Sequence, residues 1–135
     1  MQIDYFAVQP SGPKGALEAH VLYPGWNQRQ NEEWERAVHY GAGLIRIRQR
    51  GTELRIPIEF GFGYVLQYIR QFMEAERKGG SIRQKMQAQL DWIAEGLPVR
   101  FKREKETIVV TAERSHAFAE RPFLEALEKS MYVLP

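Results

Sequence analysis

The stretch LIRIRQRGTELRIPIEF, residues 44–60, decides the fold of this chain. Apolar residues alternate with charged residues on both sides of Gly51-Thr52, a pattern typical of β-strands with one buried face. Glycine at the first position of a two-residue turn favours type II′, so the stretch predicts a β-hairpin. This turn pairs Arg50 with Glu53, Arg48 with Arg55, Ile47 with Ile56 and Ile45 with Ile58.

One face of the predicted hairpin is apolar, and the other carries Arg46, Arg48 and Arg55. The predicted register places no carboxylate directly opposite any of the three arginines. Like charges opposite one another destabilise a sheet. A chain that retains such a face is expected to present it to something acidic. The alternative is a solvated sheet face whose charges prevent edge-to-edge pairing.

Composition limits the classes of protein to consider. A length of 135 residues, of which 44% are hydrophobic and 27% charged, predicts one globular domain spanning residues 1–135. The chain has no cysteine, which excludes disulfides, thiolate catalysis and cysteine-based zinc sites. Neither a long apolar span nor a secretory leader is visible, so we expect a cytoplasmic protein without a membrane segment. The net charge of +2 is small, and an acidic partner must therefore be met by local clustering.

The rest of the chain predicts the element order ββ-α-ββ-α-α-ββ-α. The expected elements are a hairpin of Ile3–Val8 and Leu17–Tyr23, a helix between Asn31 and Gly41, the arginine hairpin, a helix from about Tyr64, a helix after Ser81, a hairpin of Val99–Arg103 and Thr107–Thr111, and a helix from Pro122. Strands joined by short turns are antiparallel. We therefore expect an α+β fold: a two-layer sandwich in which one antiparallel sheet of three β-hairpins carries helices on one face.

Two central helices are predicted from apolar periodicity. The first has an inward stripe of Val65, Leu66, Ile69, Phe72 and Met73. The second is expected to start at a capping box of Ser81 and Gln84 and to run through Ile82, Met86, Leu90 and Ile93. Trp92 is expected to be packed.

Further candidate binding residues are Arg100, Lys102 and Trp26. The two basic residues would join the arginine face if the second and third hairpins belong to one sheet. Trp26 lies in the loop YPGWNQRQN, and exposed tryptophan and arginine often anchor protein interfaces. The alternative for Trp26 is a ring that closes one end of the core.

Catalytic and cofactor motifs are weak. The three histidines are widely spaced, so neither a metal nor another cofactor is expected. Ser115 is interpreted as a turn or cap residue rather than a nucleophile. The sequence thus favours a non-enzymatic protein-binding module, such as an inhibitor, an immunity-type protein or an adaptor, which engages an acidic partner. The alternative is a nucleic-acid-binding module, although Phe60 and Phe101 fall on the apolar side and offer no stacking surface. A small-molecule enzyme ranks third. The sequence leaves the oligomeric state open.

Overall fold

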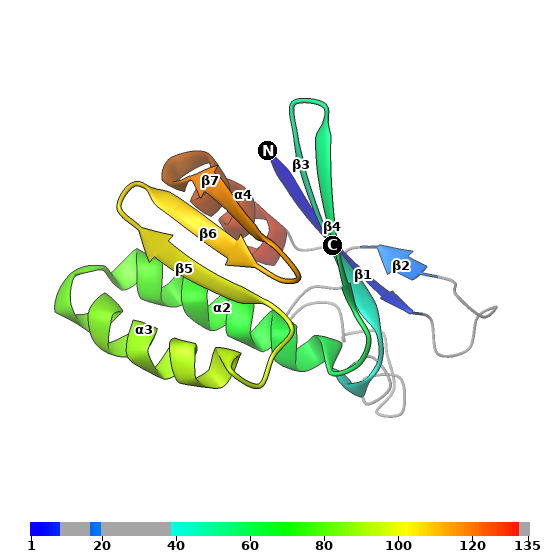
Figure 1. Cartoon of the computed structure of the whole chain (residues 1–135), viewed down its shortest axis with the longest axis horizontal. Coiled ribbons are helices and arrows are strands. Elements are labelled where there is room, and N and C mark those ends of the chain that lie inside the picture. Colours follow the sequence, from blue (N-terminus) through cyan, green and yellow to red (C-terminus); the bar gives the residue numbers. More distant parts are fainter. Residues whose placement is uncertain (9–16, 20–38, 133–135) are drawn as a thin grey trace.

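The computed structural model describes residues 1–8, 17–19 and 39–132, and within these ranges the chain is an α+β fold with two antiparallel sheets (Figure 1). The strands are β1 (Gln2–Val8), β2 (Leu17–Ala19), β3 (Gly43–Gln49), β4 (Thr52–Ile58), β5 (Arg100–Glu104), β6 (Thr107–Thr111) and β7 (Ser115–Ala119). The helices are α2 (Phe62–Lys78), α3 (Gly80–Ala94) and α4 (Glu120–Tyr132). Of the helix expected between Asn31 and Gly41, only His39 and Tyr40 lie within the described residues, and both are helical.

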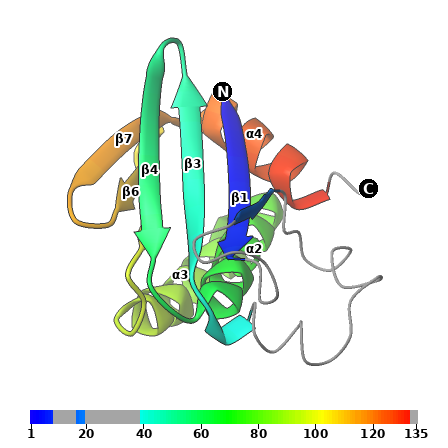
Figure 2. The same cartoon turned by 90° about the vertical axis from the view of Figure 1, so that its right-hand side faces the viewer.

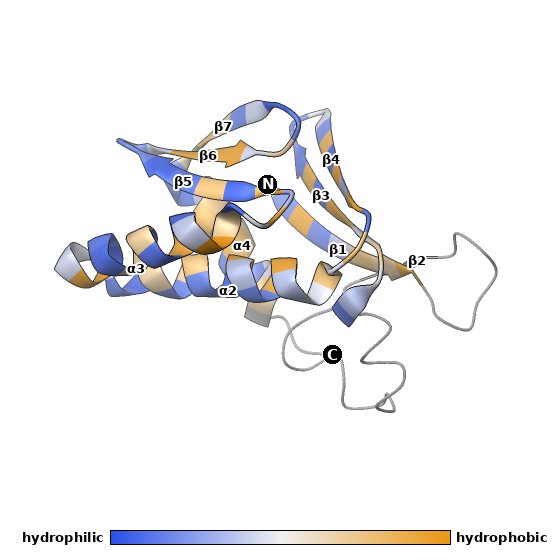
Figure 3. Ribbon diagram, turned by 60° about the horizontal axis from the view of Figure 1, so that its bottom comes forward, coloured by the Kyte–Doolittle hydropathy of each residue, from blue (hydrophilic) through white to orange (hydrophobic). Residues whose placement is uncertain are grey.

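The first sheet has the strand order β2-β1-β3-β4 and buries one of its faces. Hydrophobic and hydrophilic residues alternate along its strands, as predicted (Figure 3). The inward residues are Ile3, Tyr5, Ala7, Ile45, Ile47, Ile56 and Ile58. The helices lie behind this sheet in Figure 2, so its opposite, outer face is turned toward the viewer.

The turn between β3 and β4 differs from the prediction by one residue. The central residues are Arg50 and Gly51, with φ of 38° and 79°, and Gln49 pairs with Thr52. Positive φ at both central positions is the mark of a type I′ turn, whose twist matches that of the flanking strands. The predicted pairing was therefore wrong by two positions along the partner strand. Because side chains alternate with period two, a shift of two keeps every residue on its predicted face.

The prediction of one sheet was also wrong, because the third hairpin belongs to a separate sheet with the order β5-β6-β7. Strand β4 is an edge of the first sheet. Hydrogen-bonded and non-hydrogen-bonded pairs alternate from the tight turn, which places Pro57 at a position whose nitrogen faces away from β3. Proline has no N–H to donate there, so this edge resists continuation of the ladder.

The second sheet contains one strand that the sequence analysis missed. Ser115 begins β7 rather than serving as a turn or cap residue, and β7 pairs with β6 along its length. Helix α4 then begins at Glu120, two residues before Pro122. Proline is tolerated there because the N–H groups of the first helical turn have no partner within the helix. The predicted hairpin of β5 and β6 is confirmed, with Phe101, Ile108 and Val110 buried.

Helices α2 and α3 differ in how much of their surface they bury. All five residues of the predicted α2 stripe are buried. On α3 only Leu90 and Ala94 are buried, whereas Ile82 is 53% exposed and Trp92 is 75% exposed. Of the residues predicted along α3, Leu90 is buried and Met86 packs partly buried against the core, whereas Ile82 and Ile93 are exposed, and the expected packing of Trp92 was wrong. The capping box was also wrong, because α3 begins at Gly80 and Ser81 lies inside its first turn.

Two buried tyrosines tie the sheets to the helices. Ser130 of α4 donates its hydroxyl hydrogen to the carbonyl of Leu127, so Tyr5 of β1 donates to the Ser130 oxygen at 2.7 Å. Tyr68 of α2 accepts from the Phe101 N–H at 2.7 Å and donates to the Phe101 carbonyl. Burial raises the pKa of Tyr5 and raises that of Tyr68 to about 12. Both hydroxyls thus stay protonated and hold the layers in register.

Candidate functional site

The outer face of the first sheet is built from three rows that cross β1, β3 and β4. The paired residues are Gln2, Arg48 and Glu53 in the first row, Asp4, Arg46 and Arg55 in the second, and Phe6, Leu44 and Pro57 in the third. We call these nine residues the outer face. Two rows are charged and one is apolar, so the face combines guanidinium groups with a small hydrophobic strip.

Arg46 is fixed by a carboxylate that the sequence analysis did not place. Asp4 is directly opposite Arg46 and has no exposed surface, and its Oδ2 accepts from Arg46 Nη2 at 2.8 Å and from Nε at 3.2 Å. The Arg46 guanidinium also lies 4.8 Å from the centre of the Phe6 ring, within the range of a cation–π contact. Only 22% of the Arg46 side chain is exposed. Arg46 therefore supports the sheet and offers little to a partner.

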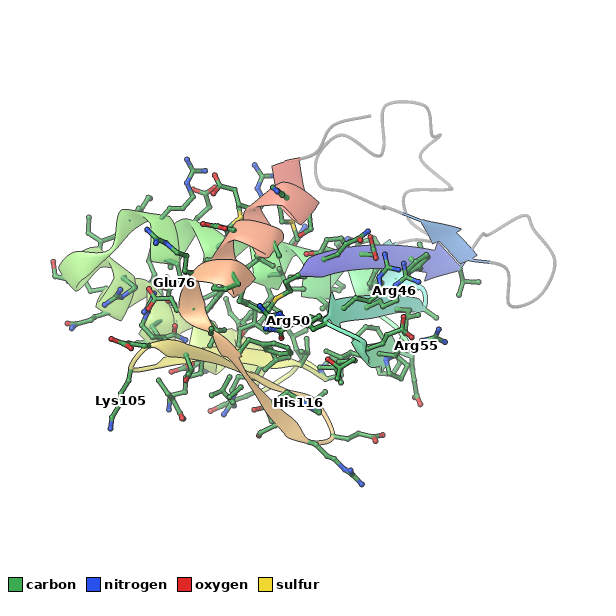
Figure 4. All side chains as sticks on the ribbon, turned by 90° about the horizontal axis from the view of Figure 1, so that it is seen from above. Arg46, Arg50, Arg55, Glu76, Lys105 and His116 are labelled. Atoms are coloured by element: carbon green, nitrogen blue, oxygen red, sulfur yellow. The ribbon has the colours of Figure 1, made fainter. Side chains whose placement is uncertain are left out.

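Arg48 and Arg55 are more accessible. Arg48 is 42% exposed and reaches Asp4 through a single long contact of 3.4 Å. Arg55 is 64% exposed and binds Glu53 on its own strand at 2.7 Å. A guanidinium carries five N–H donors, so these contacts leave most of the donors of both arginines unused. Figure 4 shows Arg46 and Arg55 on adjacent strands, where they form the like-charge pair that was predicted for Arg48 and Arg55.

The net charge of the outer face is smaller than the sequence suggested. Glu53 lies opposite Arg48 and also approaches Arg46 at 3.8 Å, while Asp4 lies opposite Arg46. The prediction that no carboxylate is opposite these arginines was wrong. Three guanidinium groups against two carboxylates leave one net positive charge. This arrangement favours directional hydrogen bonding over broad electrostatic attraction.

Two further predicted site residues, Arg100 and Lys102, do not lie on the outer face. They are exposed on β5, which belongs to the other sheet, so the condition under which they would share one surface with Arg46 is not met. Trp26 lies outside the described residues. Phe60 was expected on the apolar side of the hairpin, but it follows the end of β4 and is 75% exposed. It lines a different surface, described below.

A groove of about 500 Å³ continues from the outer face past the free edge of β4. Arg55 and Pro57 belong to the outer face and also line this groove, whose opposite wall includes Arg114 and His116. In Figure 2 the segment from β6 to β7 lies beside β4, and Figure 4 shows His116 on that side. A partner seated on the outer face could extend a side chain into this groove.

The sequence contains a feature that could have pointed to Asp4 as a partner of the arginines. Asp4 is the one charged residue in the mainly apolar segment QIDYFAV. It lies on the same side of β1 as Gln2 and Phe6. An acidic residue in a strand is stabilised by a basic residue directly opposite it on the neighbouring strand. The pairing of β1 with β3, however, joins segments about forty residues apart, and no local pattern fixes that register.

A second ionic cluster joins α2, β5 and α4. Arg103 binds Glu76 through its Nε at 2.9 Å and Glu120 at 2.7 Å. These contacts raise the pKa of Arg103, and the hydrogen bond from Arg103 lowers the pKa of Glu120. The side chain of Glu76 is only 2% exposed. The cluster links α2, β5 and α4. Because the Arg103 guanidinium is already shared between two carboxylates, we assign the cluster a role in stabilising the fold.

Comparison of the chain with protein families, curated proteins and solved structures finds no match. Among residues 1–8, 17–19 and 39–132, no group of three or more histidine, aspartate and glutamate side chains is arranged to hold a metal ion. Over the same residues, no helix combines the length and hydropathy needed to cross a bilayer.

Proposed function

We propose that this chain is a non-enzymatic protein-binding module, of the inhibitor, immunity or adaptor type, that engages an acidic partner through its outer face. The observation that carries the proposal is that two accessible arginines, Arg48 and Arg55, share one face with the apolar row of Phe6, Leu44 and Pro57, and that Arg55 lies in the row next to it. Interfaces combine a small apolar centre with arginines that form forked hydrogen bonds to carboxylates.

The rigid setting of the face also supports binding. Because Asp4 contacts Arg48 and Glu53 orients Arg55, a partner carboxylate meets guanidinium groups that have already lost part of their conformational freedom. Preorganisation of this kind reduces the entropic cost of association. The apolar row then adds burial without a further ordering cost.

Nucleic acid is a less favoured partner. Single strands are usually held by exposed aromatic rings together with a positively charged groove. On the outer face the aromatic ring is Phe6, which is half-buried and covered by Arg46, and the net charge is only one positive unit. A nucleic-acid module on this face would lack both parts of that arrangement.

The test compares two double variants with the same change in charge. Arg48→Gln/Arg55→Gln alters the outer face but keeps the Arg46–Asp4 pair, whereas Arg100→Gln/Lys102→Gln alters β5. Proteins retained from a cell extract by the immobilised wild-type chain are identified by mass spectrometry, and the affinity of each purified candidate is then measured. We expect the outer-face variant to weaken binding by about tenfold or more and the β5 variant to leave it unchanged.

Equal affinities for both variants would contradict the proposal. A labelled single-stranded 20-nucleotide RNA and the corresponding DNA are titrated in parallel at several salt concentrations. Tight binding that falls steeply with salt would favour the nucleic-acid alternative, because the slope reports phosphate neutralisation. Thermal unfolding of both double variants tests whether a loss of binding arises from loss of the fold.

A further inference from the structure

A second surface, which uses none of the outer-face residues, is a groove between the start of α2 and the end of α3. It has a volume of about 680 Å³, within the usual size range of ligand pockets. We call it the aromatic groove; it is lined by Tyr40, Phe60, Gly61, Tyr64, Gln67, Tyr68, Gln71, Ile93, Glu95, Gly96, Leu97 and Pro98.

The rings of this groove are exposed although they are large. Phe60 is 75% exposed, Tyr40 56% and Tyr64 44%. His39 packs against Tyr64 with ring centres 4.2 Å apart, and Tyr40 meets Tyr64 edge to face at 5.7 Å. A hydrogen bond to Tyr40 raises the pKa of Tyr64, and the two rings are also in contact. Exposed aromatic rings held this rigidly are typical of binding surfaces.

The geometry of the rings narrows the choice of ligand. Tyr40 and Tyr64 are in contact with one another, so a ligand does not fit between these two rings and must lie along their outer sides. The rings form a ridge beside a groove instead. Tyr64, Gln67, Tyr68 and Gln71 follow one face of α2 over about 10 Å, which matches roughly three to four residues of a polyproline II helix.

The polar groups of the groove favour the same ligand. Gln67 and Gln71 are exposed and offer amide donors. A polyproline II segment has no internal hydrogen bonds, so its carbonyls are free to accept from such donors. The backbone carbonyls of an α-helical ligand are already bonded within the helix, so such a ligand would offer the glutamine amides only its side chains. Proline rings also pack well in grooves lined by aromatic side chains.

The charge of Glu95 indicates that one end of the ligand is basic. Of the described residues that line the groove, Glu95 alone carries a charge. Glu95 follows the last turn of α3, which contains no basic residue to offset the negative end of the helix dipole. A cationic side chain placed there is attracted both by the Glu95 carboxylate and by the helix end.

We propose that the aromatic groove binds a proline-rich segment of a partner protein, in polyproline II conformation, with an arginine or lysine beside its prolines. The prolines lie against Phe60 and Tyr64, the peptide carbonyls accept from Gln67 and Gln71, and the basic residue meets Glu95. This site goes beyond the proposed function, because its ligand is basic whereas the partner of the outer face is acidic.

The experiment begins with random dodecapeptides displayed on phage and selected on the full chain. We expect the selected peptides to contain repeated prolines and a basic residue. Binding of a synthetic consensus peptide is then measured by fluorescence anisotropy. Phe60→Ala and Tyr64→Ala are each expected to weaken it by about tenfold or more. In the peptide, replacing the basic residue by glutamine should weaken binding to the wild-type chain. The same peptide change should not weaken binding to the Glu95→Gln variant, which lacks the carboxylate that the basic residue contacts.

The matched control is Trp92→Ala. Trp92 is 75% exposed, as Phe60 is, but it does not line the groove, so its removal should leave the affinity within about twofold. The outer-face variant Arg48→Gln/Arg55→Gln should also bind the peptide normally, which separates this proposal from the previous one. Selection of acidic or helix-forming peptides, failure to select any peptide, or equal affinity for Phe60→Ala and the wild type would overturn the proposal. Displacement of the peptide by a neutral oligosaccharide would instead identify the groove as a carbohydrate site and would overturn it as well.

Discussion

At the scale of single residues, Asp4 has the largest influence on the outer face. Its carboxylate is fully buried and accepts from Gln2, Arg46 and Arg48. A buried carboxylate requires such donors, because an unpaired charge away from water is very unfavourable. The same contacts turn Arg46 from a free cation into a fixed part of the sheet. One residue thus decides which arginines are available to a partner.

Replacement of Asp4 by asparagine should destabilise the fold by about 1.5–3 kcal/mol, because Arg46 then loses an ionised acceptor in a half-buried position. Chemical denaturation measures the free energy of unfolding. Arg46→Met should also destabilise, and the double variant should lose less than the sum of the single losses. Glu53→Gln is the control at an exposed pair and should cost about 0.5 kcal/mol or less. Additive losses for Asp4 and Arg46 would show that the two side chains do not interact.

At the scale of elements, the hairpin of β3 and β4 contains a residue under backbone strain. Arg50 adopts a φ of 38°, in the left-handed region that most side chains avoid. Asparagine adopts this region more readily, and Asn-Gly is the preferred pair for a type I′ turn. The strain at Arg50 is therefore a property of the local turn that substitution can relieve.

Arg50→Asn should stabilise the protein by about 0.5–1 kcal/mol, because the left-handed conformation costs asparagine less than arginine. Gly51→Ala should destabilise it by about 1 kcal/mol through backbone strain alone, since a methyl group at Gly51 would meet no other atom within 4 Å. Both values come from thermal or chemical unfolding. A neutral or destabilising Arg50→Asn would show that the left-handed conformation of Arg50 carries no cost that asparagine relieves.

The cluster of Arg103, Glu76 and Glu120 makes stability depend on acid. Arg103 lowers the pKa of Glu120 in the folded state, so the resulting stabilisation is present above the ordinary glutamate pKa and is lost as the pH falls through the lowered value. Glu120→Gln should therefore be less stable than the wild type at neutral pH, and the difference should shrink in acid. Unfolding midpoints at about pH 7 and pH 3 measure this change. Glu128→Gln, on the exposed side of α4, controls for the charge, and a difference that does not vary with pH would refute the role of Glu120.

At the scale of the whole molecule, one hydrophobic core joins both described sheets and helices α2, α3 and α4. Phe101 of the second sheet packs edge to face against Phe72 of α2 and against Phe123 of α4, at 5.4 Å and 5.6 Å. Residues of the first sheet belong to the same buried cluster. A change in α2 should therefore affect the stability of both sheets together.

Phe72→Ala should lower the free energy of unfolding by about 3–5 kcal/mol, and Ile69→Ala by about 2–5 kcal/mol, because both side chains are fully buried and leave cavities. A single unfolding transition should shift in each case. Gln67→Ala, at an exposed position on the same helix, should change stability by about 0.5 kcal/mol or less. Two separate transitions, one of them unshifted, would show that the sheets unfold independently.

The sequence by itself determined the features that depend on neighbouring residues. Alternation fixed the inner and outer faces of β3 and β4, and the 3.6-residue period fixed the buried stripe of α2. The exposure of Arg48 and Arg55 followed from the same alternation. The predicted faces of β3 and β4 were correct although the turn was assigned one residue away, because a register shift of two residues does not change the side on which a residue lies.

Only the tertiary structure decided which segments meet. The pairing of β1 with β3 brought Asp4 to Arg46, and the division into two sheets separated Arg100 and Lys102 from the outer face. The shallow packing of α3 left Ile93 partly exposed at the aromatic groove. Contacts between residues far apart in the chain depend on how the whole core packs, and no local pattern of residues contains that information.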